Sequence, residues 1–327
     1  MRVLVVSNMK PDAAAPQRGS FVRDQAAGLR RAGIDVEMLE LPPGWRNYRR
    51  SVRSIRQALR RSRFDLVHAH FGLTGWFAAL AGASPLVVTF HGTDVHHRVT
   101  GALSRRLVRR IDLAAAASRE LFERGGDGRA LHRPVGRSAV LPCGADLQRF
   151  RRIPQAEARV ELDLDADGRY LLFPASPDRP EKRFDRAEEI ARIADAKLLT
   201  AGRIDPARMP LWVNAASAVL VTSDYEGFGL AAVEALACGR PVISTPVGIA
   251  PALLEGIDGC LAAPFDAGRW ADLAREHLDA RDPRVSGEAR AQWFSATTLA
   301  ARVAAAYGEL DGVASAEING VTSADLS

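Results

Sequence analysis

Residues 219–245 read VLVTSDYEGFGLAAVEALACGRPVIST, and this stretch decides the expected fold. It opens with an apolar run typical of a buried strand, passes through a loop with two glycines, and becomes helical near Gly229. The apolar run over 241–244 then predicts a second strand. Strands that alternate with helices predict a parallel sheet covered on both faces, with ligands bound beyond the carboxyl ends of the strands.

The same alternation continues in both directions along the chain. In the first half we predict strands over 2–7, 34–41, 65–68, 86–90, 113–117 and 139–141, with helices over 21–32, 74–81 and 102–110. In the second half we predict strands over 170–174, 197–200, 218–222, 241–244 and 259–261, with helices over 184–193, 229–238, 267–278 and 296–307. The polar residues 143–169 are expected to connect the halves. The expected fold is therefore α/β, with doubly wound parallel-sheet domains at 1–150 and 151–310 and a disordered tail at 311–327.

The composition is that of a soluble globular protein. The chain has 327 residues, of which 47% are hydrophobic and 25% charged. No apolar run reaches the roughly 18 to 20 residues of a membrane span, and the start of the chain lacks a secretory leader, so a cytoplasmic location is expected. Three cysteines without a Cys-x-x-Cys spacing argue against a disulfide framework or a zinc site.

Charge is distributed unevenly between the two halves. Residues 1–150 carry 25 Lys and Arg against 12 Asp and Glu, a net charge of +13, whereas the remaining residues carry a net charge of −8. This asymmetry suggests that the first half faces an anionic partner. We expect no nucleic-acid partner.

Residues 45–64 contain eight arginines and no acidic residue. Tyr48, Val52, Ile55 and Leu59 recur at helical spacing and form one apolar stripe. A basic amphipathic helix of this kind binds the surface of an anionic membrane, which would place the protein peripherally on the inner membrane face. A surface helix that packs on its own sheet through the stripe explains the same pattern, and both interpretations stay open.

Two glutamates mark the expected ligand site within 219–245. Glu234 is the only charged residue from Phe228 to Cys238, and an almost wholly apolar helix is expected to be buried. A buried carboxylate needs a partner, and a sugar diol is a suitable one. Glu226 lies eight residues earlier, on the order of 10 Å away along a helix, with room for a diphosphate on the helix terminus between them. A neighbouring arginine paired with Glu234 would explain these residues equally well.

The segment EGFGLAAVEALACGRPVIST at 226–245 resembles the signature of retaining glycosyltransferase family 4. Further similar segments are DLVHAHFG at 65–72, TFHGTD at 89–94, and VLPCGADLQRF at 140–150, where Cys143 stands in place of the usual Asn. The resemblance implies the GT-B architecture, in which two Rossmann-like domains face a central cleft. It also implies that Glu234 binds the donor ribose, while Glu226 and the run Gly227, Phe228, Gly229 and Leu230 bind the sugar and the diphosphate.

Other positions carry weaker family features. Lys182 matches a lysine that clamps the diphosphate in the family. The Gly-Arg pair that usually precedes this lysine is missing, and Arg179 is a candidate substitute because a guanidinium suits phosphate. A solvated cluster of charges is the alternative for both residues.

His91 and the pair Gly19 and Ser20 are the candidates from the first half. The resemblance implies that His91 approaches the donor sugar and supports the transition state, and that Gly19 and Ser20 touch the β-phosphate. Only one glycine of the usual glycine-rich pair is present there. Five of the seven histidines fall within 68–97, and we expect His68 and His70 to be packing or rim residues.

The predicted function is transfer of a hexosyl group from a nucleoside diphosphate sugar to a hydroxyl of a glycan, lipid or small-molecule acceptor, with retention and without a metal or other cofactor. The alternatives are a non-catalytic nucleotide-sugar-binding partner protein and another GT-B enzyme, such as an epimerase or a phosphorylase. The second domain is expected to be shortened, because only 200–215 stand where the family has a longer helix and strand. This departure puts base recognition in question.

Overall fold

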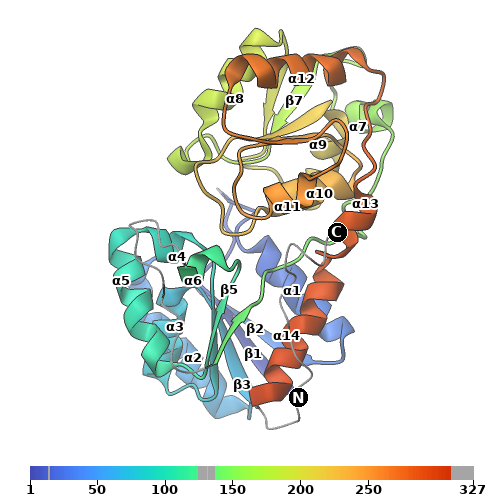
Figure 1. Ribbon diagram of the computed structural model, residues 1–327. Coiled ribbons are helices and arrows are strands. Elements are labelled where there is room, and N and C mark those ends of the chain that lie inside the picture. Colours follow the sequence, from blue (N-terminus) through green and yellow to red (C-terminus); the bar gives the residue numbers. More distant parts are fainter. Residues whose placement is uncertain (14, 124–130, 132–136, 311–327) are drawn as a thin grey trace. The chain divides into compact units, whose positions relative to one another are not determined.

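The computed structural model describes residues 1–13, 15–123, 131 and 137–310. The predicted tail at 311–327 lies outside the described residues. The chain forms two compact units, each built on a parallel sheet, and this confirms the predicted fold class (Figure 1).

The first unit contains a parallel sheet of six strands in the order β2-β1-β3-β4-β5-β6. Its strands are β1 (Arg2–Ser7), β2 (Asp35–Glu40), β3 (Leu66–His70), β4 (Leu86–Phe90), β5 (Leu113–Ala116) and β6 (Arg137–Val140). The central strands β3, β4 and β5 are buried along their whole length. Such strands bury both faces, which is why they appear in the sequence as continuous apolar runs. All six predicted strands of this half are present.

Helices cover both faces of this sheet. They are α1 (Ser20–Arg31), α2 (Tyr48–Arg61), α3 (Gly72–Ala81), α4 (Thr93–His96), α5 (Arg98–Leu107), α6 (Glu120–Glu123) and α14 (Ala296–Leu310). In Figure 1, α1 and α14 lie on one side of the sheet, and α3 and α5 lie on the other. No helix among the described residues is long and apolar enough to span a bilayer.

The last helix of the chain belongs to the first unit. The expected division placed 151–310 in the second domain, but α14 packs against α1 and the second unit ends at Ser295. Gly28 of α1 allows this contact, because a Cβ there would lie 2.7 Å from the Ala296 carbonyl oxygen. Val303 and Tyr307 of α14 are fully buried in the core of the first unit. An apolar helical stripe shows that a helix is covered but not which domain covers it.

The second unit contains a parallel sheet of five strands in the order β11-β10-β9-β7-β8. Its strands are β7 (Tyr170–Phe173), β8 (Lys197–Thr200), β9 (Ala218–Val221), β10 (Val242–Ser244) and β11 (Leu261–Ala262). Its helices are α7 (Gln155–Glu161), α8 (Phe184–Ile193), α9 (Met209–Ala215), α10 (Leu230–Ala237), α11 (Ala250–Leu254), α12 (Ala267–Asp279) and α13 (Glu288–Gln292). Trp270 of α12 and Ile190 of α8 pack on the sheet and are fully buried.

The polar connection predicted over 143–169 contains helix α7. Its buried positions are held mainly by hydrogen bonds rather than by an apolar stripe. The Gln155 amide donates to the carbonyl oxygens of Ala215 and Ala216, and the Arg159 guanidinium donates to the Ala215 carbonyl oxygen at 3.1 Å. These contacts anchor α7 to the end of α9. A search for hydrophobic periodicity misses a helix of this kind.

Candidate active site

The loop between β9 and α10 is fixed by two glycines. Gly229 precedes α10 with a φ of 100°, a backbone region that favours glycine. A Cβ on Gly248, in the loop after β10, would lie 2.3 Å from the Phe228 carbonyl oxygen. The neighbouring Ile249 amide donates to that same oxygen at 2.8 Å. The segment after β10 thus holds the glycine loop at Phe228, and the loop delivers the first amides of α10, which favour a bound anion.

Lys182 and Glu226 form an ion pair at the start of this loop. The Lys182 Nζ lies 2.6 Å from both Glu226 carboxylate oxygens, and each side chain is only 13% exposed. The Ser223 hydroxyl donates to Glu226 Oε1 at 2.7 Å. The Thr222 hydroxyl donates to the Lys182 carbonyl oxygen and fixes the lysine turn to the end of β9. The structure therefore brings together a cation and a carboxylate that lie 44 residues apart in the sequence.

Arg179 lies in the same turn as Lys182, at the N-terminal end of the short 3₁₀ helix η3 (Pro180–Lys182). Its guanidinium pairs with Glu181, with Nε 2.8 Å from Oε1, and its side chain is 49% exposed. Both predicted cations are therefore paired with glutamates. The Lys182 ammonium is the more buried of the two, which makes it the stronger candidate for a fixed phosphate contact.

The remaining donor residues lie on the loop and on α10. Gly227 and Phe228 lie in the loop, Leu230 is the first residue of α10, and Glu234 lies one turn further along that helix. Glu234 is half-buried, so the expectation of a fully buried carboxylate is wrong. It also has an interaction partner in the protein.

His91 occupies the carboxyl end of β4 in the first unit. The backbone amides of His91 and Gly92 donate to Asp94 Oδ1 at 2.9 and 3.0 Å, and the Gly72 amide donates to Asp94 Oδ2 at 2.9 Å. The His91 ring packs on Phe71, with ring centroids 4.6 Å apart, and its Nε2 is hydrogen-bonded to His70 Nδ1 at 2.9 Å. A buried carboxylate thus sets the turn that presents His91.

The imidazole of His91 is neutral at ordinary pH. Burial lowers the pKa of His91 to about 3, and the nearby His68 adds to the effect. A neutral ring offers one donor and one acceptor rather than a positive charge. At this position His91 is suited to hydrogen bonding with a substrate hydroxyl, and it is not suited to pairing with phosphate.

Gly19 and Ser20 begin helix α1. Gly19 has a φ of 71°, and a Cβ there would lie 2.6 Å from the Met9 carbonyl oxygen. The backbone conformation and the close approach to Met9 account for glycine at this position without a ligand. The role of Gly19 and Ser20 at a phosphate stays a prediction.

Two family models match the chain. The model described as Glycosyltransferase Family 4 matches residues 2–149, and the model described as Glycosyl transferases group 1 matches residues 160–280. The chain belongs to glycosyltransferase family 4. The resemblance noted in the sequence is therefore confirmed across both units of this glycosyltransferase.

Its relatives include several enzymes named D-inositol 3-phosphate glycosyltransferase. The one from Thermobispora bispora is 28% identical over 365 residues, covering 91% of this chain and 82% of that protein. The one from Mycolicibacterium paratuberculosis is 30% identical over 280 residues, covering 72% of this chain and 64% of that protein. The first alignment is longer than this glycosyltransferase itself, so the relative has residues without a counterpart here.

Solved structures show the same fold. Sucrose-phosphate synthase from Thermosynechococcus elongatus has a TM-score of 0.71 at 19% identity, covering 96% of this chain and 100% of that chain. Anabaena HepE in complex with UDP and glucose has a TM-score of 0.66 at 20% identity, covering 94% of this chain and 100% of that chain. These likenesses identify the architecture of this glycosyltransferase as GT-B.

Reasoning from the sequence missed three residues around these sites. Asp94 shapes the His91 turn, and Ser223 holds Glu226. Cys143 lies beside His70 and His91, a grouping that strand order alone brings about. For Asp94 a signal existed, since it lies in the turn that follows a buried strand, and aspartate is common in turns because its side chain hydrogen-bonds nearby backbone amides. Between β8 and β9 the chain forms the seven-residue helix α9, and shortening relative to the family stays a prediction.

Proposed function

We propose that this protein is a retaining glycosyltransferase that moves a hexosyl group from a nucleoside diphosphate sugar to an acceptor hydroxyl. The observation that carries the proposal is the Lys182–Glu226 pair beside the glycine-shaped start of α10. It joins a compact cation, a carboxylate and free helix amides, which are the groups that a diphosphate and a sugar require. Membership of family 4 and the printed activities of its relatives support the same conclusion.

In the proposed reaction, negative charge grows on the leaving diphosphate. Lys182 and the first amides of α10 stabilise that charge, and Arg179 contributes from the edge of the same turn. Glu226 and neutral His91 hold the sugar hydroxyls, and Glu234 holds the ribose. We assign no protein nucleophile. The proposal takes the nucleotide sugar as co-substrate and needs neither a separate cofactor nor a metal, because these groups neutralise the leaving group.

Two properties of the substrates follow as proposals. The acceptor belongs to the class of glycans, glycolipids and small polar metabolites. Phosphorylated inositols are the first acceptors to test, because relatives are named D-inositol 3-phosphate glycosyltransferase. The segment between β8 and β9 supplies a small wall for the nucleotide base, so we expect discrimination between bases to be modest.

The test begins with binding. Calorimetric titration of the protein with UDP, GDP, ADP and their glucose or mannose conjugates should give binding in the micromolar range, about −8 kcal/mol, with a modest preference for one base. The matching nucleotide sugar is then incubated with the acceptors, and the anomeric configuration of the product is read by NMR. Retained configuration supports the full proposal. Inverted product overturns the retaining mechanism, and binding without turnover favours a non-catalytic nucleotide-sugar-binding protein.

We also propose that α2 contacts an anionic membrane surface. Of the predicted apolar stripe, Ile55 is buried and Tyr48 is exposed, and Val52 and Leu59 are half-buried, so part of the stripe remains at the surface. Trp45, Tyr48 and Leu80 are exposed at 68%, 41% and 54%. Aromatic rings beside arginines are typical of protein surfaces that bind at the headgroup layer of a membrane.

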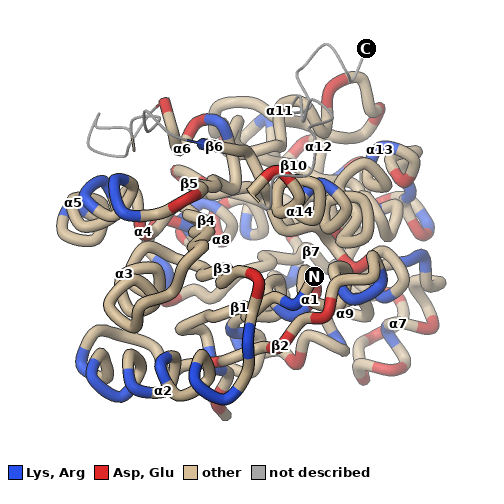
Figure 2. The backbone as a smooth tube through the Cα atoms, turned by 90° about the horizontal axis from the view of Figure 1, so that it is seen from below, with Lys and Arg blue, Asp and Glu red and all other residues tan. Residues whose placement is uncertain are grey.

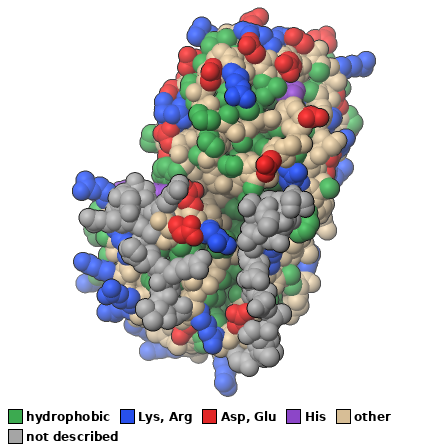
Figure 3. All heavy atoms as spheres, in the orientation of Figure 1, with side chains coloured by type: hydrophobic (Ala, Val, Ile, Leu, Met, Phe, Trp, Pro, Cys, Tyr) green, Lys and Arg blue, Asp and Glu red, His purple; other side chains and the backbone are tan. Residues whose placement is uncertain are grey.

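A groove runs along the exposed face of α2. It has a volume of about 930 Å³ and is lined by Tyr48, Arg49, Arg53, Arg56, Arg60 and Leu80 among others. Figure 2 shows the basic residues recurring along α2, and in Figure 3 Lys and Arg side chains project from the lower left margin of the first unit. A groove lined both by arginines and by the apolar parts of Tyr48, Val52 and Leu80 suits an anionic headgroup with part of its acyl chain.

Vesicle sedimentation tests this contact. The protein should pellet with vesicles that contain phosphatidylglycerol at low salt and dissociate at high salt, and it should ignore pure phosphatidylcholine. The double variant Arg53→Gln/Arg60→Gln should bind about tenfold more weakly or worse. Arg106→Gln/Arg109→Gln is the matched control, because it removes the same charge from exposed positions of the same unit. Equal loss in both variants, or binding to neutral vesicles, contradicts a specific role for α2.

A further inference from the structure

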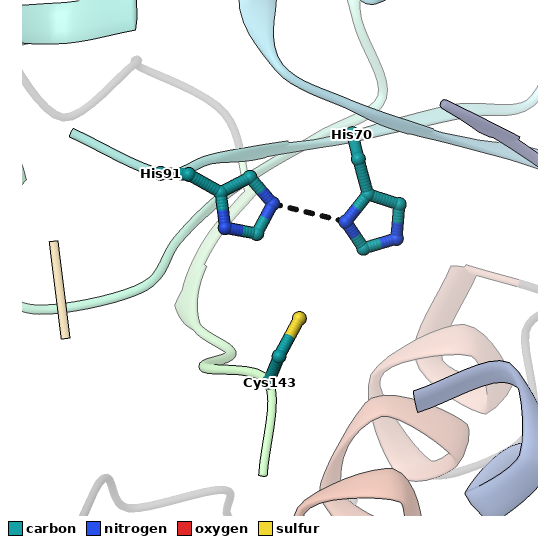
Figure 4. A group of neighbouring side chains, drawn as sticks. All are labelled: His70, His91 and Cys143. Atoms are coloured by element: carbon teal, nitrogen blue, oxygen red, sulfur yellow. Dashed lines mark hydrogen bonds between the residues drawn. The ribbon is translucent and has the colours of Figure 1, made fainter. Parts of the chain in front are cut away.

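Three potential metal ligands converge at the carboxyl ends of the strands in the first unit. His70 ends β3, His91 follows β4, and Cys143 follows β6. One ligand atom from each residue lies within 4.8 Å of the other two. Figure 4 shows the Cys143 sulfur pointing toward the space between the two imidazole rings. Only the parallel strand order brings these residues together, since they lie up to 73 positions apart in the sequence.

The histidines of this region differ in how many of their ring nitrogens are hydrogen-bonded. Both ring nitrogens of His68 are hydrogen-bonded, to the Tyr307 hydroxyl at 2.6 Å and to the Thr89 hydroxyl at 2.7 Å. His70 is hydrogen-bonded only through Nδ1, to His91, and its buried Nε2 has no partner among the described residues. A buried polar atom without a partner needs an explanation. His68 is therefore a structural residue, whereas His70 is bonded only through Nδ1, the nitrogen that faces His91.

The chemistry of the three donors selects a borderline-soft cation. Two imidazoles and one thiolate suit Zn²⁺ and its neighbours in the first transition series. Burial lowers the pKa of His70 well below its ordinary value, so both rings are neutral and each offers a lone pair. Burial also raises the pKa of the Cys143 thiol, so this sulfur is inert until a metal displaces its proton.

The geometry is close to what zinc requires. Zinc with Zn–N bonds of about 2.0 Å and a Zn–S bond of about 2.3 Å places its ligand atoms roughly 3.3 to 3.6 Å apart. The hydrogen-bonded nitrogens of His70 and His91 are 2.9 Å apart and must separate by a few tenths of an ångström. All three ligand atoms lie within 4.8 Å of one another, so the widest separation must close by no more than about 1 Å. Three protein ligands leave a fourth position for water or substrate, which half-buried His91 leaves accessible.

We propose that His70, His91 and Cys143 form a binding site for Zn²⁺ that closes on His91. On binding, Cys143 loses one proton to solvent, and the proton shared by the two imidazoles moves to a ring nitrogen that does not bind the metal. No electron is transferred in this step. Binding of the metal rests on the geometry alone. One consequence rests on the proposed function: zinc withdraws His91 from the sugar and therefore inhibits transfer.

Co²⁺ serves as the spectroscopic substitute for Zn²⁺. Protein freed of metal with a chelator and titrated with Co²⁺ should develop the intense visible bands of a tetrahedral site together with a near-ultraviolet thiolate-to-cobalt band. Added Zn²⁺ should abolish both. Cys143→Ser should lose the thiolate band and bind Co²⁺ roughly 100-fold more weakly or worse. A flat spectrum with excess Co²⁺ overturns the proposal.

The chain offers a matched control, because its other two cysteines, Cys238 and Cys260, lie in the second unit. The variant Cys238→Ser/Cys260→Ser keeps Cys143 as its only cysteine, so any thiolate band it shows must come from Cys143. This result does not depend on how well Cys143→Ser folds. Loss of the band in this folded control, or its persistence in Cys143→Ser, places the metal elsewhere and overturns the site.

An activity measurement separates the two proposals. Zn²⁺ should inhibit sugar transfer by the wild type in parallel with metal binding, and it should inhibit Cys143→Ser only at much higher concentrations. A cobalt spectrum without turnover on any substrate counts against the proposed function and leaves the metal site standing. Turnover that is insensitive to bound zinc overturns the link to His91.

Discussion

Replacing Lys182 with alanine should lower kcat/KM for sugar transfer by about 100- to 1,000-fold. The variant removes the half-buried Lys182 ammonium, whose Nζ lies 2.6 Å from both carboxylate oxygens of Glu226. An interaction that strengthens as the diphosphate leaves acts on the transition state, so the loss should fall mainly on kcat. Initial rates at saturating and limiting donor concentrations measure the two parameters.

Two controls define what the loss means. Lys197→Ala removes an ammonium from an exposed position in the same unit and should leave both parameters unchanged. Glu226→Gln and the double variant Lys182→Ala/Glu226→Gln complete a mutant cycle. If the lysine served only to hold Glu226, Lys182→Ala would cost nothing further in the Glu226→Gln background. Unchanged kcat/KM in folded Lys182→Ala would remove the lysine from the mechanism.

Glu234→Ala should weaken binding of the nucleotide sugar by about 2–3 kcal/mol, a loss of roughly thirtyfold or more in Kd. A carboxylate that accepts hydrogen bonds from two ribose hydroxyls contributes at this level when the pair excludes water. Glu234 is half-buried, so water screens it in part before the donor arrives. Calorimetry with the base that binds the wild type measures the change.

A modified ligand makes this prediction specific. A dideoxyribose analogue of the same nucleotide lacks the hydroxyls that Glu234 is proposed to accept, so wild type and Glu234→Ala should bind it equally. Glu189→Ala, an exposed glutamate on α8, is the matched control and should bind the natural donor as the wild type does. If Glu234→Ala loses the same affinity for the natural nucleotide as for the dideoxyribose analogue, Glu234 does not bind the ribose hydroxyls.

The sheets could be predicted from the sequence because their strands are buried on both faces. β4 and β9 appear as continuous apolar runs, and their predicted bounds agree with the structure to within one residue. The start of the helix after the glycine loop could also be predicted, because Gly229 marks it.

The rest could not be predicted because it depends on contacts between distant residues. Nothing local to Lys182 or Glu226 shows that they form a pair, and Cys143 meets His70 and His91 only through the strand order. Helix α7 is held by hydrogen bonds to carbonyl oxygens of α9, which leave no period in the sequence. Helix α14 has an apolar stripe, but the stripe does not say which domain covers it.

Helix α14 also sets the order in which the domains can mature during synthesis. The ribosome releases residues 1–144 first, yet the face of α1 around Gly28 and Leu29 stays uncovered until residues 296–310 have been made. The second unit, which ends at Ser295, has its complete sequence before the first unit does. Domains usually fold in the order of translation, N-terminal first. In this chain the N-terminal domain begins first and finishes last, so the nascent protein exposes an apolar surface on it until residues 296–310 have been made.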